Sequence, residues 1–102
     1  MRKLARGTTP TITMTYKTID VSLIVEAYLT MRQRGLEIEK TLAEAAVADN
    51  SLSWTLTQQE TLDLRTDSSV NIQCRYRLQD GTAGTSEIYT VSPYAILKEG
   101  VI

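Results

Sequence analysis

The sequence predicts an all-β domain: an antiparallel two-sheet β-sandwich of the immunoglobulin-like kind, with about six to seven strands and one short helical turn. Two observations favour this fold. Short segments place apolar residues at every second position, which is the period of a strand with one buried face. Turn-forming residues separate these segments at short intervals. We expect a single β-sandwich domain over residues 10–102, because a chain of 102 residues is the usual size for one core.

The N-terminal segment is polar and basic, with Gly7 and two threonines before Pro10. This composition is typical of a chain end that is mobile or that is ordered only by a partner. We therefore predict a flexible basic arm over residues 1–9. The first strand is expected just after it, where Ile12, Met14 and Tyr16 alternate with threonines.

Residues 21–34 fit either a long strand or a helix. The six odd positions from Val21 to Met31 are all apolar, as in a strand with one buried face. Val21, Ile24, Tyr28 and Met31 also fall on a helical stripe, and several residues here are good helix formers. We favour the strand because the two-residue period fits better. A helix would make this an α+β fold.

Gly35 marks the turn of a predicted hairpin. Beyond it, Leu36, Ile38 and Leu42 alternate with polar residues in the return strand. Residues 42–48 are rich in alanine and glutamate, and their pattern fits either a helical turn or an edge strand.

The segment after residue 51 has the clearest strand pattern in the chain. Leu52, Trp54 and Leu56 alternate there with serine and threonine, and a turn signal precedes them at residues 49–51. Because Trp54 lies between two leucines on one face, we expect its ring at the centre of the core.

A capping box follows this strand. The Thr57 hydroxyl is expected to accept from the Glu60 amide while the Glu60 carboxylate accepts from the Thr57 amide. This pattern predicts a short helical turn that ends near Leu62 or Leu64 and crosses from one sheet to the other.

The segment 70–79 alternates between an apolar and a polar face. The apolar face carries Val70, Ile72, Cys74, Tyr76 and Leu78. Asp80 and Gly81 are a strong hairpin signal, so the last long strand is expected to return antiparallel over residues 86–91. Ser92 and Pro93 are expected to end it.

The chain lacks the residues of most catalytic and metal sites. It has no histidine and one cysteine, which excludes the usual zinc sites and a nucleophile activated by imidazole. The single Cys74 cannot form an intramolecular disulfide and is expected to be buried and inert. The five glycines are scattered and form no phosphate-binding loop. We predict a protein that is not an enzyme, with no catalytic, cofactor-binding or metal-binding residue.

Two carboxylate pairs remain as candidates for acid and base chemistry. They are Glu37 with Glu39, on the polar face of a predicted strand, and Glu60 with Asp63, at the capping box. Solvated and capping roles explain these positions better, so a carboxylate-dependent hydrolase is the weakest function hypothesis.

The charge balance favours neither nucleic acid nor an anionic membrane as a partner, because 11 basic and 12 acidic residues give a net charge of -1. No small-molecule substrate is indicated either. No signal peptide or membrane-spanning segment is recognised, so we expect the protein in the cytoplasm unless an assembly carries it elsewhere.

Candidate contacts with partner proteins lie in three places. They are the basic arm, one polar strand face and the apolar C-terminal tail, and they comprise Arg2, Lys3, Arg6, Tyr28, Tyr94, Ile96 and Leu97. The expected partners are copies of the same chain or other structural proteins. A carbohydrate or cell-wall recognition module is the alternative, although it requires clustered aromatic rings and the sequence scatters them.

Four segments carry a family resemblance: RGTTP at residues 6–10, SLSWTLTQQETL at 51–62, VNIQCRYRLQDGTAGTSEI at 70–88 and LKEGVI at 97–102. Together they resemble a family of small proteins encoded by bacteriophages and prophages. The resemblance implies a virion-associated structural or assembly protein of the tail or baseplate region, found in the host cytoplasm during assembly and then in the virion. It assigns no functional residues.

Overall fold

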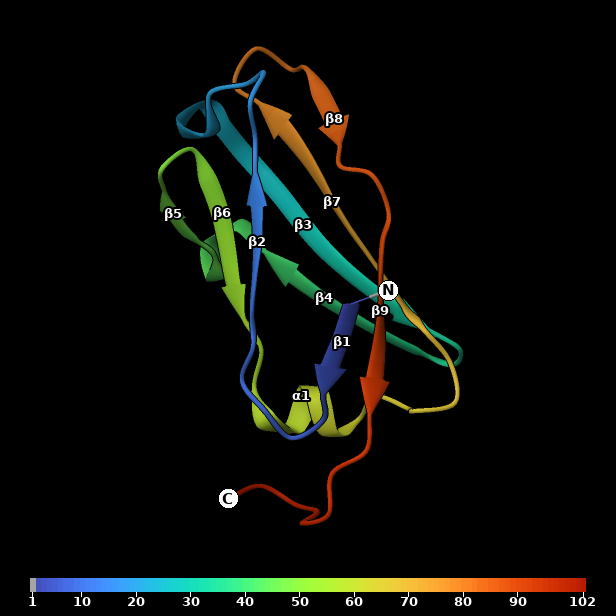
Figure 1. Cartoon of the computed structure of the whole chain (residues 1–102). Helices are drawn as coiled ribbons and strands as arrows, with labels where there is room; N and C mark the ends of the chain where they lie inside the picture. The colour runs from blue at the N-terminus through green and yellow to red at the C-terminus, as the bar shows by residue number, and fades with distance from the viewer. Residues whose placement is uncertain (1) are drawn as a thin grey trace.

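Alternating apolar residues form two β-sheets that pack face to face in the computed structural model, which describes residues 2–102 (Figure 1). The larger sheet has the order β1 (Arg2–Ala5), β9 (Tyr89–Tyr94), β7 (Val70–Leu78), β3 (Ile24–Gln33) and β4 (Leu36–Thr41), and β8 (Ala83–Thr85) also pairs with β7. The smaller sheet has the order β2 (Thr11–Thr15), β6 (Ser51–Thr55) and β5 (Ala46–Ala48). The all-β sandwich prediction is confirmed.

The core lies between the two sheets and follows the alternation of the strands. Leu29 and Met31 of β3, Cys74 of β7 and Leu52 and Trp54 of β6 are each at most 1% exposed. Burial of one large apolar side chain stabilises the fold by about 1.5–3 kcal/mol. The core positions predicted for Trp54 and Cys74 are therefore confirmed.

Residues 21–34 are mainly a strand, as favoured from the sequence. The 3₁₀ turn η1 (Val21–Leu23) precedes β3, and the register of β3 with β7 shifts between Ile24 and Glu26, as at a β-bulge. Ile24 is buried as a result, whereas Leu23 and Val25 are 42% and 44% exposed. The prediction that all odd positions share the core face is wrong at these two residues, because the bulge reverses the alternation.

Both interpretations of residues 42–48 hold in part. The 3₁₀ turn η2 (Leu42–Glu44) leaves the larger sheet, and β5 then forms an edge strand of the smaller sheet. The predicted capping box is confirmed: the Glu60 N–H donates to Thr57 Oγ1 over 3.1 Å, and the Thr57 N–H donates to Glu60 Oε1 over 2.8 Å. It begins α1 (Gln58–Leu62), which connects β6 of one sheet with β7 of the other.

The segment predicted as a flexible arm forms an edge strand over residues 2–5. This strand, β1, pairs in parallel with β9, with Arg2 opposite Val91 and Ala5 opposite Tyr94. Leu4 is buried in the core cluster, which gives the pairing an apolar anchor. The other strand pairs among the described residues are antiparallel, so the larger sheet is mixed rather than purely antiparallel.

β9 runs through Pro93, where the sequence predicted an end. The Arg6 N–H donates to Tyr94 O over 3.3 Å, so residue 94 directs its polar groups toward β1 and Pro93 directs its nitrogen away from β1. On that side the pairing of β9 with β7 has already ended at Val91. The missing N–H of the proline therefore costs no ladder hydrogen bond, and the strand continues to Tyr94.

Candidate functional site

The carboxylate pairs considered from the sequence hold separate structural positions. Glu37 is exposed and accepts hydrogen bonds from Arg32, the nearer at 2.8 Å, while Glu39 is exposed on β4. Asp63 accepts from Gln59 Nε2 over 2.9 Å at the end of α1. Within residues 2–102, no three histidine, cysteine, aspartate or glutamate residues are grouped so that they could hold a metal ion.

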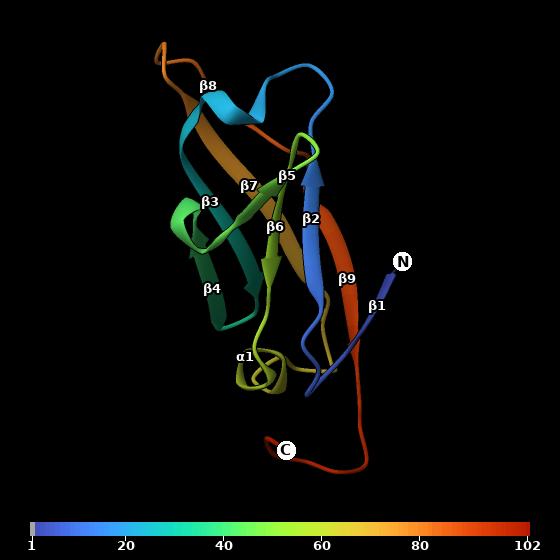
Figure 2. The same ribbon diagram turned by 90° about the vertical axis from the view of Figure 1, so that its left-hand side faces the viewer.

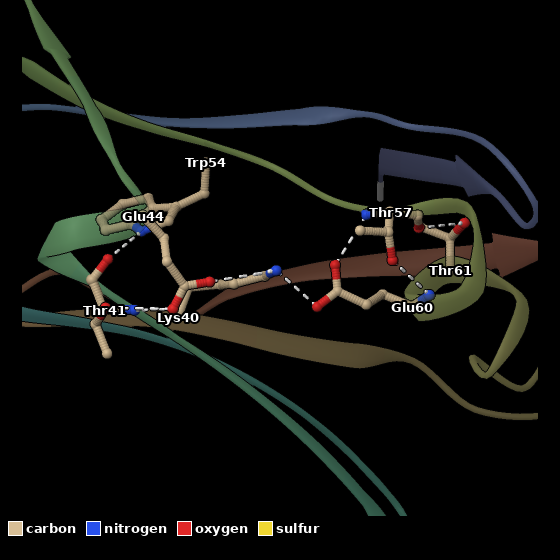
Figure 3. Close-up of polar contacts among 7 residues, drawn as sticks. All are labelled: Lys40, Thr41, Glu44, Trp54, Thr57, Glu60 and Thr61. Atoms are coloured by element: carbon tan, nitrogen blue, oxygen red, sulfur yellow. Dashed lines mark hydrogen bonds and ion pairs between the residues drawn. The ribbon is translucent and has the colours of Figure 1, made fainter.

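Lys40 connects β4 to the capping box of α1. Its Nζ lies 2.7 Å from Glu60 Oε2 and 3.6 Å from Glu44 Oε2, and its side chain is only 12% exposed (Figure 3). Burial disfavours the charged form of Glu60, but the hydrogen bonds from Lys40 and Thr57 outweigh it and lower the pKa of this carboxyl. This cluster joins elements of the fold and leaves Lys40 between two acidic partners.

Trp54 and Thr61 tie the same region together through polar contacts (Figure 3). The indole Nε1–H of Trp54 donates to Thr41 O over 2.9 Å, so the smaller sheet is bonded to the end of β4. The Thr61 hydroxyl is fully buried and donates to Thr8 O over 2.8 Å, which joins α1 to the segment after β1. The side of the sandwich near α1 and η2 is therefore closed by internal hydrogen bonds.

Arg6, predicted as a partner contact, is engaged within the chain. Its Nε and Nη2 donate to Leu64 O and Leu62 O over 2.9 and 2.7 Å, and its Nη1 contacts Glu99 Oε2 at 3.0 Å. The first two contacts satisfy carbonyl groups at the end of α1. Ile96 also lies inward, because a Cβ built on Gly7 would be 2.7 Å from Ile96 Cδ1.

The remaining predicted contacts are exposed but do not meet at one place. Arg2 and Lys3 lie on the edge strand β1. Tyr94, 48% exposed, is the last residue of β9, and Leu97, 105% exposed, belongs to the C-terminal segment that follows β9 (Figure 1). Tyr28 lies on the outer face of the larger sheet, where its hydroxyl donates to Glu26 over 2.6 Å. That hydrogen bond raises the pKa of Tyr28.

The opposite side of the sandwich is open between β2 and β9. We call this opening the slot. Its apolar lining comes from Ile12, Met14, Tyr16, Ile72, Tyr76, Tyr89 and Val91, with Arg2 at one end, and it holds about 670 Å³. In Figure 1 the smaller sheet ends at β2, and none of its strands lies in front of β8 or β9. The slot is thus a position that a further strand would fill.

Two tyrosines form the upper part of the slot. The rings of Tyr16 and Tyr76 meet edge to face, with centroids 5.3 Å apart and planes at 73°. Burial, followed by the neighbouring Cys74 thiol, raises the pKa of the Tyr16 hydroxyl above its usual range, so it stays protonated at neutral pH. No described residue meets both the distance and the angle required for a hydrogen bond to this buried hydroxyl. The neighbouring Cys74 thiol is only a weak hydrogen-bonding group.

β2 presents a free backbone edge to the slot. The Tyr16 N–H donates to Asn50 O, and Pro10 O accepts from the Leu56 N–H, so even-numbered residues of this segment bond toward β6. By the alternation of antiparallel ladders, Thr11, Thr13 and Thr15 direct their N–H and C=O groups to the free edge. A row of unpaired backbone groups therefore borders an apolar opening.

A comparison of the sequence with protein-family models and with curated proteins finds no match. The resemblance to phage-encoded proteins therefore stays a prediction. In the part of the chain that the structure describes, no helix has the length and apolar character needed to cross a membrane.

Sequence reasoning missed the slot, although it predicted the strands that border it. The alternation at Ile12, Met14 and Tyr16 indicated a strand with a core face but not a strand at the edge of a sheet. Which strand lies at an edge depends on pairing between distant segments, here β2 with β6. The nearest local indication of the slot was the hairpin signal at Asp80 and Gly81, because this hairpin places Gly84 against the Tyr76 ring.

Proposed function

We propose that this chain is a non-enzymatic structural or assembly protein that acts through contacts with other proteins. The observation that supports this most directly is the free edge of β2 beside the slot. Exposed edge strands offer backbone donors and acceptors that another chain can pair with, and natural proteins usually cover or charge such edges. β2 has neither protection, because its exposed residues are threonines.

The proposed setting is a bacteriophage particle, in the tail or baseplate region, with copies of this chain or neighbouring structural proteins as partners. This setting rests on the sequence resemblance alone. The exposed apolar residues Leu97, Val101 and Ile102 of the C-terminal segment add a second surface suited to protein contacts.

Carbohydrate recognition is the second candidate, and one observation favours it. Tyr16, Tyr76 and Tyr89 line the same slot, although the sequence separates them widely. A stacking platform needs exposed ring faces, and of these three only Tyr89 is in the exposed class, at 50%. Binding on a glycan array that Tyr89→Ala abolishes would favour this candidate over assembly.

Light scattering coupled to size-exclusion chromatography tests the assembly proposal. The full chain is measured alone and after co-expression with the proteins encoded beside it, and we expect a defined oligomer or complex. Thr13→Pro should abolish it, because this proline removes an N–H from the free edge without removing a bond to β6.

Thr13→Ala is the matched control, since it removes the same side chain but keeps the backbone N–H. It should assemble like the unmodified chain, and circular dichroism should show that both variants are folded. A full chain that stays monomeric at every concentration and forms no complex with any co-expressed protein would contradict the proposal.

A further inference from the structure

We infer that the slot receives an extended strand supplied by a partner protein, running antiparallel to β2 and in the same direction as β1. This inference rests on the proposed function and names the form of the partner. Its basis is the free edge of β2, the position and direction of β1 and the chemistry of the slot lining.

The free edge of β2 specifies the main-chain contacts. Thr11, Thr13 and Thr15 offer an N–H and a C=O each, spread over a strand about 17 Å long. An added strand of similar length would pair with all three residues. Their side chains leave the edge open because their hydroxyls lie on the outer face, for example with Thr13 Oγ1 3.0 Å from Ser53 Oγ.

β1 shows how a strand enters this side of the sandwich. It lies along the edge of β9 from Val91 to Tyr94, and its described part begins at Arg2, at the end of the slot. Figures 1 and 2 show β1 and β9 pointing the same way and β2 pointing the opposite way. A strand in the slot that runs in the same direction as β1 and β9 is therefore antiparallel to β2, which is the favourable geometry for pairing with it.

The two sheets differ in width at this side. This difference makes a single added strand a better occupant of the slot than the sheet edge of a second copy of the chain. Beyond β7 the larger sheet continues with β9 and β1, whereas the smaller sheet ends at β2. A second copy that paired its own β2 at this edge would bring its larger sheet against β9 and β1. One extended segment fits beside β2 without this conflict.

The lining specifies the side chains of the added strand. Its inward residues are small or apolar, because they face Met14, Ile72 and Val91. Arg2 is the only charged side chain among the described residues of the lining. It lies where the added strand ends, so an acidic residue or a terminal carboxylate is expected there.

An N-terminal extension of the full chain tests whether the slot accepts a strand. About seven residues of alternating threonine and valine, joined before Met1 through a short flexible glycine and serine linker, cover the length of β2 at high effective concentration. The matched control replaces each added threonine with proline, which cannot donate to β2. Hydrogen exchange measured by NMR then follows the amides of Thr11, Thr13 and Thr15, with the β6-facing amide of Met14 as an internal reference.

We expect the threonine and valine extension to slow exchange at the three free-edge amides by at least about tenfold relative to the proline control, with Met14 unchanged. Equal exchange at those amides with both extensions, while Met14 reports an intact β2, would overturn the inference. Light scattering separates the two proposals. If a complex still forms with Thr13→Pro, and the two extensions give equal exchange at the free-edge amides, the assembly proposal stands and strand addition is rejected.

Discussion

The two sides of the sandwich are built differently. On the side of β4 and β5, η2 connects the sheets covalently, the Trp54 indole donates to Thr41 O, and Lys40 pairs with Glu60. On the side of β2 and β9, residues 6–10 connect β1 with β2 along the chain, but the free edge of β2 borders the slot, and the Tyr16 hydroxyl has no partner of full geometry. Side-chain contacts therefore join the two sheets on one side, whereas the slot lies open between them on the other.

This difference assigns separate roles to the two sides. A buried donor without a partner costs about 1–3 kcal/mol of stability, so a chain optimised only for stability would fill or remove it. The closed side supplies the stability of the sandwich, and the open side keeps the groups that a partner can use. Substitutions on the two sides should therefore differ in size and even in sign.

The largest effect is expected at Trp54 on the closed side. Trp54→Ala should lower the free energy of unfolding by about 3–5 kcal/mol, because it empties a site that is 1% exposed and also breaks the bond to Thr41 O. Urea unfolding followed by circular dichroism measures this change. Trp54→Phe keeps most of the ring and should cost clearly less. Equal losses for the two variants would mean that the hydrogen bond, not the ring volume, closes this side.

The next effect is expected at Gly84, beside the slot. A Cβ there would overlap the outer end of the Tyr76 ring, so Gly84→Ala should push the ring into the slot and destabilise the fold by about 1–3 kcal/mol. The backbone of Gly84 is outside the left-handed region, so the contact with Tyr76 is the main penalty. A double-mutant cycle with Tyr76→Ala checks this cause. The cost should largely disappear in the Tyr76→Ala background, and an undiminished cost would reject the steric explanation.

The sequence predicted the closed side better than the open side, for a physical reason. Thr57 and Glu60 are three residues apart, so their capping box could be recognised from local spacing. The bulge at Val25 could not, because it arises from the pairing of β3 with β7. The open edge of β2 likewise depends on where the smaller sheet ends.

Pro93 illustrates the same limit at a single residue. Proline ends strands when a neighbouring strand needs its N–H, and the sequence does not reveal where the neighbours end. Here β7 no longer pairs with β9 beyond Val91, so Pro93 remains inside β9. The candidate site was missed for the same reason, since Tyr16 and Tyr76 meet only after β2 has packed on β7.

A smaller effect is expected at Lys40, where the closed side depends on charge. Lys40→Met should cost about 1–2 kcal/mol at neutral pH, between the values typical of exposed and buried ion pairs. The exposed Lys3→Met is the matched control and should change stability by less than about 0.5 kcal/mol. Urea unfolding at neutral pH measures both variants.

The cost of Lys40→Met should also depend on pH. The pKa of Glu60 is lowered in the folded state, so its pairing stabilises the fold above the ordinary carboxyl value of 4.5 and is lost as the pH falls through the lower folded value. The difference between Lys40→Met and the unmodified chain should therefore shrink below about pH 4.5. A difference that stays constant down to pH 3 would show that packing of the lysine stem, and not its charge, is responsible.

The smallest and most discriminating effect is expected at Tyr16 on the open side. Tyr16→Phe removes a buried hydroxyl that has no partner of full geometry, so stability should stay the same or rise by up to about 1 kcal/mol. A complex formed through the slot should be unchanged, because this hydroxyl is buried against Cys74 and an added strand does not reach it. An unchanged complex would separate this hydroxyl from the free edge of β2, where Thr13→Pro should abolish the complex. A clear loss of stability would instead mean that the contact with Cys74 is a structural hydrogen bond, and the open side would lose its unpaired donor.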